Sequence, residues 1–324
     1  MPIYHVKHTT KYVYPSAVTD SANQIILSPP SDDYQEILNH EIKIRPLAVL
    51  DSYFDYFGNK VGVFSIIEPH TDLLIVVEAE VETKPVPVPS DFWSAKSQWE
   101  NIDKVSWEVD FLDFVKFGSY QSLTAIRNEI AGIANRDKTV FQSVKALSSY
   151  VYDHITYQQG VTDVETDIDK IWELKAGVCQ DFAHLLLEML RISAIPARYI
   201  SGYICPMGNE LRGVGATHAW VEAYIPDYGW LGIDPTNNCL VSDRHIRIAF
   251  GRNFNDCTPV KGTYKGSSAH TLTVAVVITN EKIKAEEELA LQQEAVYVQE
   301  VVEPIAVVNS YQKFIEMQQQ QQQQ

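Results

Sequence analysis

Three prolines at alternate positions divide this 324-residue chain into two parts of different character. In Lys84-Pro85-Val86-Pro87-Val88-Pro89 each proline lacks a backbone N–H and fixes φ at about −65°, which disfavours both helix interiors and central strands. A stiff, extended linker is expected there. A chain of this length also suggests two domains at roughly 150 residues each. The prolines therefore predict a domain boundary close to residue 84.

Residues 1–84 carry the patterns of β-strands. Ile42-Lys43-Ile44-Arg45 alternates strictly between apolar and charged side chains, and the run from Leu73 to Val81 is rich in β-branched residues. Gly58-Asn59 lies between an aromatic run and a β-branched run, which is typical of a hairpin turn. A small β-rich domain is predicted over residues 1–84.

The pattern changes after the prolines. Residues 85–119 are interpreted as a proline-rich linker and connecting segment, and apolar residues at helical spacing then occupy 120–134 and 139–155. A further amphipathic helix is predicted to begin at Cys179 and to end before Pro196. Strand-like runs follow, at 197–205, 218–225, 230–233, 246–250 and 271–279. Helices followed by strands predict an α+β fold over 120–280, with helices packed on an antiparallel sheet.

The segment 281–324 is predicted to be a C-terminal tail. Residues 281–293 have the pattern of a short charged helix, and the chain ends in seven glutamines, 318–324. A polyglutamine run cannot bury enough apolar surface to fold alone, so we expect it to be mobile.

Composition excludes several classes of function. The formal charge of −16 disfavours binding to nucleic acids and to anionic lipid surfaces. There is no apolar run of about 18 residues and no visible signal peptide, which predicts no membrane span and a cytoplasmic location. The four cysteines are irregularly spaced and suggest neither a disulfide framework nor structural zinc, so no metal or cofactor is predicted. The acidic run 163–169 lacks the glycine and terminal glutamate of a calcium loop, which favours a solvated loop.

Three segments carry residues capable of chemistry. Cys179 follows Gly177 in the first turn of the predicted helix, where free N–H groups and the helix dipole favour a thiolate and can stabilise an oxyanion. Taken alone, such a cysteine is more often a small core residue. His218 lies on an alternating strand, and Asp234 ends the next strand, immediately before Pro235. Taken singly, each of these has an ordinary structural interpretation.

Together they suggest a catalytic triad. A thiolate nucleophile needs a histidine to share its proton, and that histidine needs a carboxylate to fix its orientation. The strands of His218 and Asp234 are joined by the short connection 226–229, so we expect them to be adjacent. Glu222 is the rival acid, but four residues at about 3.3 Å each place it roughly 13 Å along the strand from His218.

Other polar residues near the cysteine have weaker claims. His184 lies about 140° around the helix from Cys179, so it and Asp181 are expected to pack and to hydrogen-bond locally. The second oxyanion donor stays open among Tyr157, Gln158 and Gln159. For Trp220 and Trp230, walling of a cleft and buried packing are equal alternatives.

Four blocks in this order resemble the transglutaminase-like superfamily, specifically its bacterial branch that is often labelled cysteine protease. The blocks are residues 177–184, 195–203, 218–222 and 229–237. The resemblance implies a papain/transglutaminase-like core preceded by a small β-rich domain. It also implies Cys179 as nucleophile, His218 as base and Asp234 as orienting acid. Members of the superfamily include protein cross-linkers, peptidases, deglycosylating amidases and catalytically silent relatives.

The leading hypothesis is therefore a Cys-His-Asp enzyme that forms an acyl-enzyme thioester from a protein or peptide substrate. A cysteine peptidase or amidase is expected if water resolves the thioester. The alternatives are a protein-glutamine gamma-glutamyltransferase, in which an amine resolves it, and a non-catalytic binding or scaffold protein on the same fold. The sequence leaves the oligomeric state open.

Overall fold

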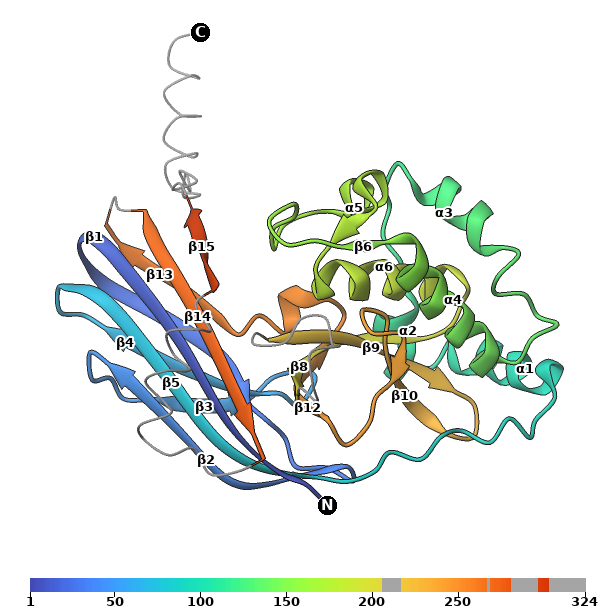
Figure 1. Cartoon of the computed structure of the whole chain (residues 1–324), viewed down its shortest axis with the longest axis horizontal. Coiled ribbons are helices and arrows are strands. Elements are labelled where there is room, and N and C mark those ends of the chain that lie inside the picture. Colours follow the sequence, from blue (N-terminus) through green and yellow to red (C-terminus); the bar gives the residue numbers. More distant parts are fainter. Residues whose placement is uncertain (206–216, 267–268, 281–296, 303–324) are drawn as a thin grey trace, which may run out of the picture.

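One very long strand organises the N-terminal lobe of the computed structural model, which describes residues 1–205, 217–266, 269–280 and 297–302. The first half of β1 (Ile3–Ser28) pairs with β5 (His70–Thr83) and β14 (His270–Thr279). Its second half pairs with β4 (Lys60–Ile66) and β13 (Val260–Lys265). The register shifts in the middle of β1, where the strand passes from one sheet layer into the other. Figure 1 shows this β lobe beside a second lobe that contains the helices.

The remaining strands extend the two layers. β2 (Gln35–Arg45) pairs with β5, β3 (Asp51–Phe54) with β4, and β15 (Tyr297–Val302) with β14. Inward-facing side chains form an apolar cluster made of Tyr14, Val18, Ile25, Leu27, Phe64, Ile66, Leu73, Ile75 and Val77. The turn between β3 and β4 contains Gly58 at φ 84°, a left-handed conformation that glycine adopts without strain. The predicted β-rich N-terminal region and its hairpin are confirmed.

Two parts of the chain differ from the sequence-based assignment. Residues 260–265 and 270–279, assigned to the core segment 120–280, form β13 and β14 of the N-terminal lobe. β14 pairs with the first half of β1 along nine residues and covers backbone groups that would otherwise be an open sheet edge. The connecting segment 85–119 contains two helices, α1 (Ala95–Val105) and α2 (Val109–Val115). Trp99 and Ile102 of α1 are buried, so this segment belongs to the packed structure.

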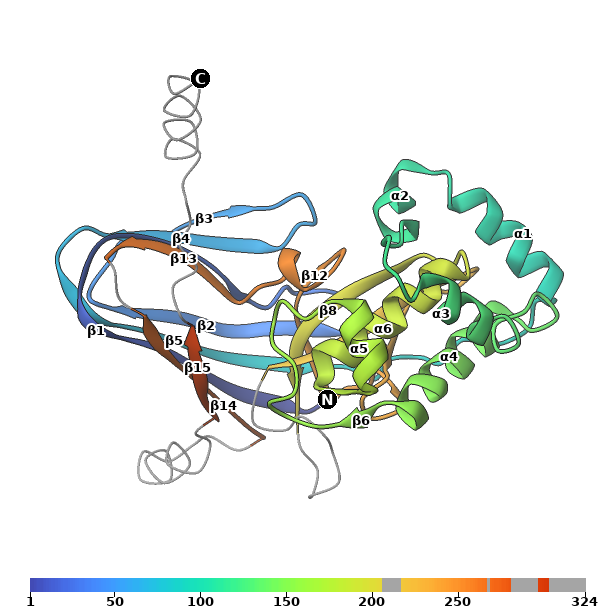
Figure 2. The same ribbon diagram turned by 90° about the horizontal axis from the view of Figure 1, so that it is seen from above.

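The second lobe packs helices on a five-stranded antiparallel sheet, so the predicted α+β fold is confirmed (Figure 2). The strands run in the order β11 (Cys239–Leu240), β10 (Gly229–Asp234), β9 (His218–Ile225), β8 (Ala197–Ile204) and β12 (His245–Gly251). Besides α1 and α2, this lobe contains α3 (Leu123–Ile130), α4 (Val140–His154), α5 (Ile168–Leu174) and α6 (Cys179–Ile192). The apolar face of α6 is buried in the same core as Ala219, Val221 and Ala223 of β9.

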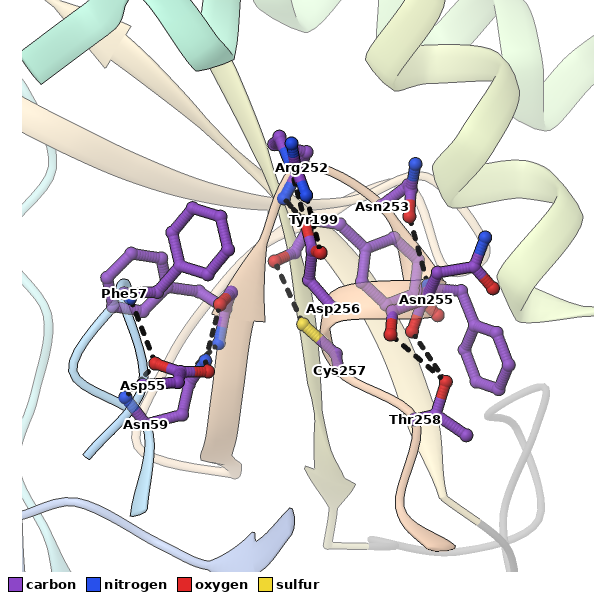
Figure 3. Close-up of polar contacts among 12 residues, drawn as sticks. Asp55, Phe57, Asn59, Tyr199, Arg252, Asn253, Asn255, Asp256, Cys257 and Thr258 are labelled. Carbon is purple, nitrogen blue, oxygen red and sulfur yellow. Dashed lines mark hydrogen bonds and ion pairs between the residues drawn. The ribbon is translucent and has the colours of Figure 1, made fainter. Parts of the chain in front are cut away.

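The two lobes meet at β12, the edge strand of this sheet. The Gln35 side chain donates to the carbonyl of Arg247 (2.9 Å) and accepts from its N–H (2.8 Å). Asn59 does the same at Phe250, with distances of 2.8 and 3.0 Å. Figure 3 shows Asn59 with Asp55 beside this strand. Two side-chain amides thus complete the hydrogen bonds of an exposed edge, as a neighbouring strand would.

The predicted helix 281–293 and the polyglutamine run 318–324 lie outside the described residues. Among the residues that the structure describes, no helix has both the length and the hydropathy needed to cross a membrane.

Candidate active site

The nucleophile candidate begins a helix whose start is fixed by a buried carboxylate. Asp181 accepts hydrogen bonds from the Val178 N–H and the Thr162 hydroxyl, both at 2.7 Å. Burial raises the pKa of Asp181. A Cβ on Gly177 would lie 2.3 Å from the same carboxylate, so this approach requires glycine. Asp181 thus makes the local hydrogen bonds that were expected of it. Cys179 follows directly, in the first turn, where backbone N–H groups have no intrahelical acceptor.

A short strand lies beside this turn. β6 (Thr156–Tyr157) pairs in parallel with β7 (Ala176–Gly177), and the Gln158 N–H donates to the Gly177 carbonyl at 2.9 Å. The Tyr157 ring packs near Phe182, with 6.2 Å between ring centres. Residues 157–158 are thus held next to the segment that carries Cys179. Which of Tyr157, Gln158 and Gln159 donates to an oxyanion stays a prediction.

His218 and Asp234 meet across neighbouring strands. The register pairs Ile233 with Val221, so Asp234 is a diagonal neighbour of His218, within reach of a long side chain. His218 Nε2 lies 2.8 Å from Asp234 Oδ2, and both side chains are fully buried. Such a contact fixes both the orientation and the tautomer of the imidazole.

The other ring nitrogen of His218 is turned away from the carboxylate. Nδ1 is buried and makes no hydrogen bond of ordinary geometry within the described part of the chain. The Cys179 Sγ lies 3.9 Å from the carbonyl of Thr217, the residue before His218. The thiol is close enough to interact with the imidazole and to affect its pKa. The structure thus brings the three predicted residues together.

The charges of the pair outweigh the effect of burial. Burial alone would lower the pKa of His218, but the Asp234 carboxylate and the Cys179 thiol raise it to about 10. Burial alone would raise the pKa of Asp234, but His218 and His245 hold it far below its usual range. At neutral pH this arrangement favours an imidazolium beside a carboxylate.

The Asp234 carboxylate accepts further hydrogen bonds. Its Oδ1 accepts from the N–H groups of Thr236 (2.9 Å) and Asn237 (3.2 Å), and its Oδ2 accepts from the Asn237 side chain (2.8 Å). The turn after β10 therefore holds the carboxylate in position before any substrate binds.

Comparisons with known proteins show the family of this chain. Residues 4–82 match the bacterial transglutaminase-like N-terminal region, and residues 127–235 match the transglutaminase-like superfamily core. The chain is 32% identical to uncharacterized protein ML0607 of Mycobacterium leprae over 85% of its own length and 97% of that protein. The chain belongs to the transglutaminase-like superfamily.

Two further relatives show how far the likeness extends. A crystal structure named "Putative Cysteine Protease from Cytophaga hutchinsonii" has the same fold, with a TM-score of 0.68 at 20% identity. The alignment of the two structures covers 87% of this chain and 92% of that one. A protein-glutamine gamma-glutamyltransferase of Pseudomonas aeruginosa is 37% identical over 76 residues, which is 21% of this chain and 11% of that protein.

The remaining candidates make other contacts. Glu222 binds Arg198 at 2.6 Å, so it is engaged away from His218. His184 accepts from the Phe254 N–H at 3.2 Å, and burial lowers its pKa to about 4. Trp220 is buried, whereas Trp230 stacks on Phe111 with 5.7 Å between ring centres.

Two residues near Asp234 were not predicted as site residues. His245 Nε2 lies 3.6 Å from Asp234 Oδ2, and Cys239 pairs with Asp234 across β10 and β11. Burial and the Asp234 charge raise the pKa of the Cys239 thiol to about 11. One potential metal-ligand atom from each of the three residues lies within 4.8 Å of the others. Spacings of five and six residues match no common metal motif, so no sequence signal pointed to this cluster.

Proposed function

We propose that this protein is a thiol enzyme that cleaves an amide or peptide bond through an acyl-enzyme thioester. One observation carries the proposal. Cys179 at a helix start, the ring of His218 and the buried carboxylate of Asp234 form a continuous chain of contacts. Each element matches a requirement of nucleophilic catalysis by a thiol.

In the acylation step, the proton of the Cys179 thiol lies on His218, as the raised pKa of that imidazole favours, and the thiolate sulfur attacks the carbonyl carbon of the amide. The C–S bond forms, and the carbonyl oxygen becomes an oxyanion near the N–H groups of the first turn of α6. His218 then gives the proton to the leaving nitrogen as the C–N bond breaks. Asp234 stays ionised throughout and keeps His218 in the productive orientation.

Deacylation decides the reaction class. If water attacks the thioester with His218 as base, the products are a carboxylic acid and the free thiol. We favour this outcome because it needs no second bound substrate. A primary amine in place of water gives a new amide, the reaction of a protein-glutamine gamma-glutamyltransferase. The local likeness to the Pseudomonas aeruginosa enzyme keeps this second candidate open.

The test combines labelling and product analysis. Wild-type protein, Cys179→Ala and a matched thiol control, Cys205→Ala, are treated with a thiol-directed electrophile and with a peptide library. We expect labelling of Cys179 and cleavage of peptides in wild type and in Cys205→Ala. In Cys179→Ala we expect no label at residue 179 and no cleavage. Mass spectrometry of glutamine-containing peptides with added primary amine then separates hydrolysis from transamidation. An unlabelled Cys179 at neutral pH, or turnover that survives in Cys179→Ala, favours a non-catalytic scaffold or another site.

A further inference from the structure

We propose that Asp234, Cys239 and His245 form a binding site for a thiophilic divalent cation, best matched by Zn²⁺, and that occupancy draws Asp234 away from His218. The inhibitory part of this proposal rests on the proposed function. The binding part stands on the ligand geometry alone.

The chain path brings the three residues together. Asp234 and Cys239 are directly opposite on β10 and β11, a relation that places Cβ atoms about 5 Å apart. The connection from β11 to β12 then crosses the sheet, with the Val241 N–H donating to the Gly232 carbonyl at 3.0 Å. It returns at His245, whose ring packs edge-on to Trp220 with 5.3 Å between ring centres.

The separation of the ligand atoms suits a metal better than a hydrogen bond. His245 Nε2 and Asp234 Oδ2 are 3.6 Å apart, longer than the roughly 2.7–3.2 Å of an N–H···O bond. Two ligand atoms about 2.0–2.1 Å from a tetrahedral zinc lie roughly 3.3 Å apart. A small side-chain adjustment therefore converts this gap into coordination geometry.

His245 supplies an independent indication of a missing partner. Its side chain is fully buried, and Nε2 makes no hydrogen bond within the described residues. Nδ1 accepts from the Ser242 N–H at 3.3 Å. Ligation through Nε2 moves the ring proton to Nδ1 and breaks this long and therefore weak contact. The free energy of zinc binding at structural sites is much larger than that of one hydrogen bond, so coordination outweighs this loss.

The donor types select the ion. One thiolate, one imidazole and one carboxylate suit Zn²⁺, whereas Ca²⁺ and Mg²⁺ prefer oxygen ligands and would find only the carboxylate here. Cys239 is partly exposed and offers a route from solvent, and three protein ligands leave a fourth position for water. A cation on Asp234 competes with His218 for the carboxylate, so the imidazole loses the partner that orients it.

The binding test uses Co²⁺, whose bond to a thiolate produces a near-ultraviolet charge-transfer band. The titration is done in the Cys179→Ala protein, which removes the other thiol near a histidine. We expect a cobalt–thiolate band that Zn²⁺ abolishes by displacement and that survives in a further Cys205→Ala change. Adding Cys239→Ser or His245→Gln should weaken metal binding more than about 100-fold. Losses of about 10–100-fold are typical when a residue that only supports a ligand is changed. Circular dichroism checks that each variant is folded. We expect Cys239→Ser to be the best tolerated of these changes, because Cys239 lies on a short edge strand.

The regulatory test measures alkylation of Cys179, which needs no substrate. We expect Zn²⁺ to slow alkylation at least tenfold in the wild-type protein, and to have little effect in Cys239→Ser relative to its own metal-free rate. Absence of the cobalt band, or its persistence in Cys239→Ser, overturns the site. Inhibition that persists in Cys239→Ser places the ion on Cys179 itself and overturns the regulatory role. If no amide substrate is found, the cobalt titration still decides the site, so the two proposals fail separately.

Discussion

Replacing Asp234 by asparagine tests the proposed triad most directly. The carboxylate accepts from His218, Thr236 and two groups of Asn237 and donates to none. An amide of the same shape has one oxygen and one NH₂ group. Whichever way the side chain is turned, the NH₂ faces either His218 or the backbone donors. With the NH₂ toward Nε2, His218 keeps its proton on Nδ1 and cannot accept one from Cys179.

The expected loss is in catalysis more than in substrate binding. The equivalent change in the serine protease triad lowers kcat by about 10⁴, through the same inversion of the histidine tautomer. We expect Asp234→Asn to lower kcat by roughly 10³–10⁴ and to leave KM within a few fold, because the triad binds little of the ground-state substrate.

Stability should change with a specific pH dependence. The depressed pKa of Asp234 stabilises the fold above its unfolded value of about 3.9, and this stability is lost as pH falls through the folded pKa. The raised pKa of His218 stabilises the fold below its unfolded value of about 6.5, and this stability is lost as pH rises through about 10. Breaking a buried pair costs about 3–5 kcal/mol. The deficit of Asp234→Asn should be largest between about pH 4 and 6.5 and should shrink toward pH 10.

The assay pairs urea unfolding at several pH values with kcat and the rate of Cys179 alkylation. Glu222→Gln is the matched control, since it also removes one carboxylate, here partly buried, that binds a cation. We expect Glu222→Gln to lose stability but to keep the alkylation pH profile. If Glu222→Gln abolishes activity while Asp234→Asn leaves it intact, the triad is assigned wrongly.

Three further outcomes follow from particular contacts. Cys179→Ala should abolish turnover and leave the unfolding midpoint nearly unchanged; gross unfolding of this variant would show a structural cysteine. Gly177→Ala should lower activity at least tenfold, because its Cβ displaces Asp181 from the helix start; wild-type kinetics would show that the turn relaxes freely. Asn59→Leu should destabilise the protein by about 1–3 kcal/mol by leaving the Phe250 backbone unpaired, which urea unfolding measures; an unchanged midpoint would mean that water replaces the amide.

The sequence predicted the elements whose signals are local. Apolar residues at helical spacing predicted α4 and α6, and alternation predicted β9, because each pattern reflects one buried face. A run rich in β-branched residues predicted β5. The same signals could not say which sheet a strand joins. β14 alternates like any half-buried strand, and only its pairing with β1 shows that it belongs to the N-terminal lobe. Prolines 85, 87 and 89 led to the prediction of a linker and connecting segment over 85–119. That segment contains α1, whose Trp99 and Ile102 are buried.

The candidate site divides in the same way. Cys179, His218 and Asp234 lie in segments with recognisable chemistry, and a short connection between two strands makes contact between the last two predictable. His245 has no such signal. It reaches Asp234 only because the segment after β11 crosses the sheet before β12 begins, a path that residue spacing does not encode.

That path also gives the N-terminal lobe a connection to the site. Gln35 and Asn59 hold the backbone of β12 at Arg247 and Phe250, and β12 begins at His245. His245 in turn faces the carboxylate that orients His218. Without the lobe, β12 would pair only with β8, and its outer edge would have no hydrogen-bond partners to hold it in place. A displacement of about 1 Å in a catalytic group can cost on the order of 10²-fold in rate. The β lobe is therefore connected to the proposed triad through β12 and His245, although Cys179, His218 and Asp234 all lie in the other lobe.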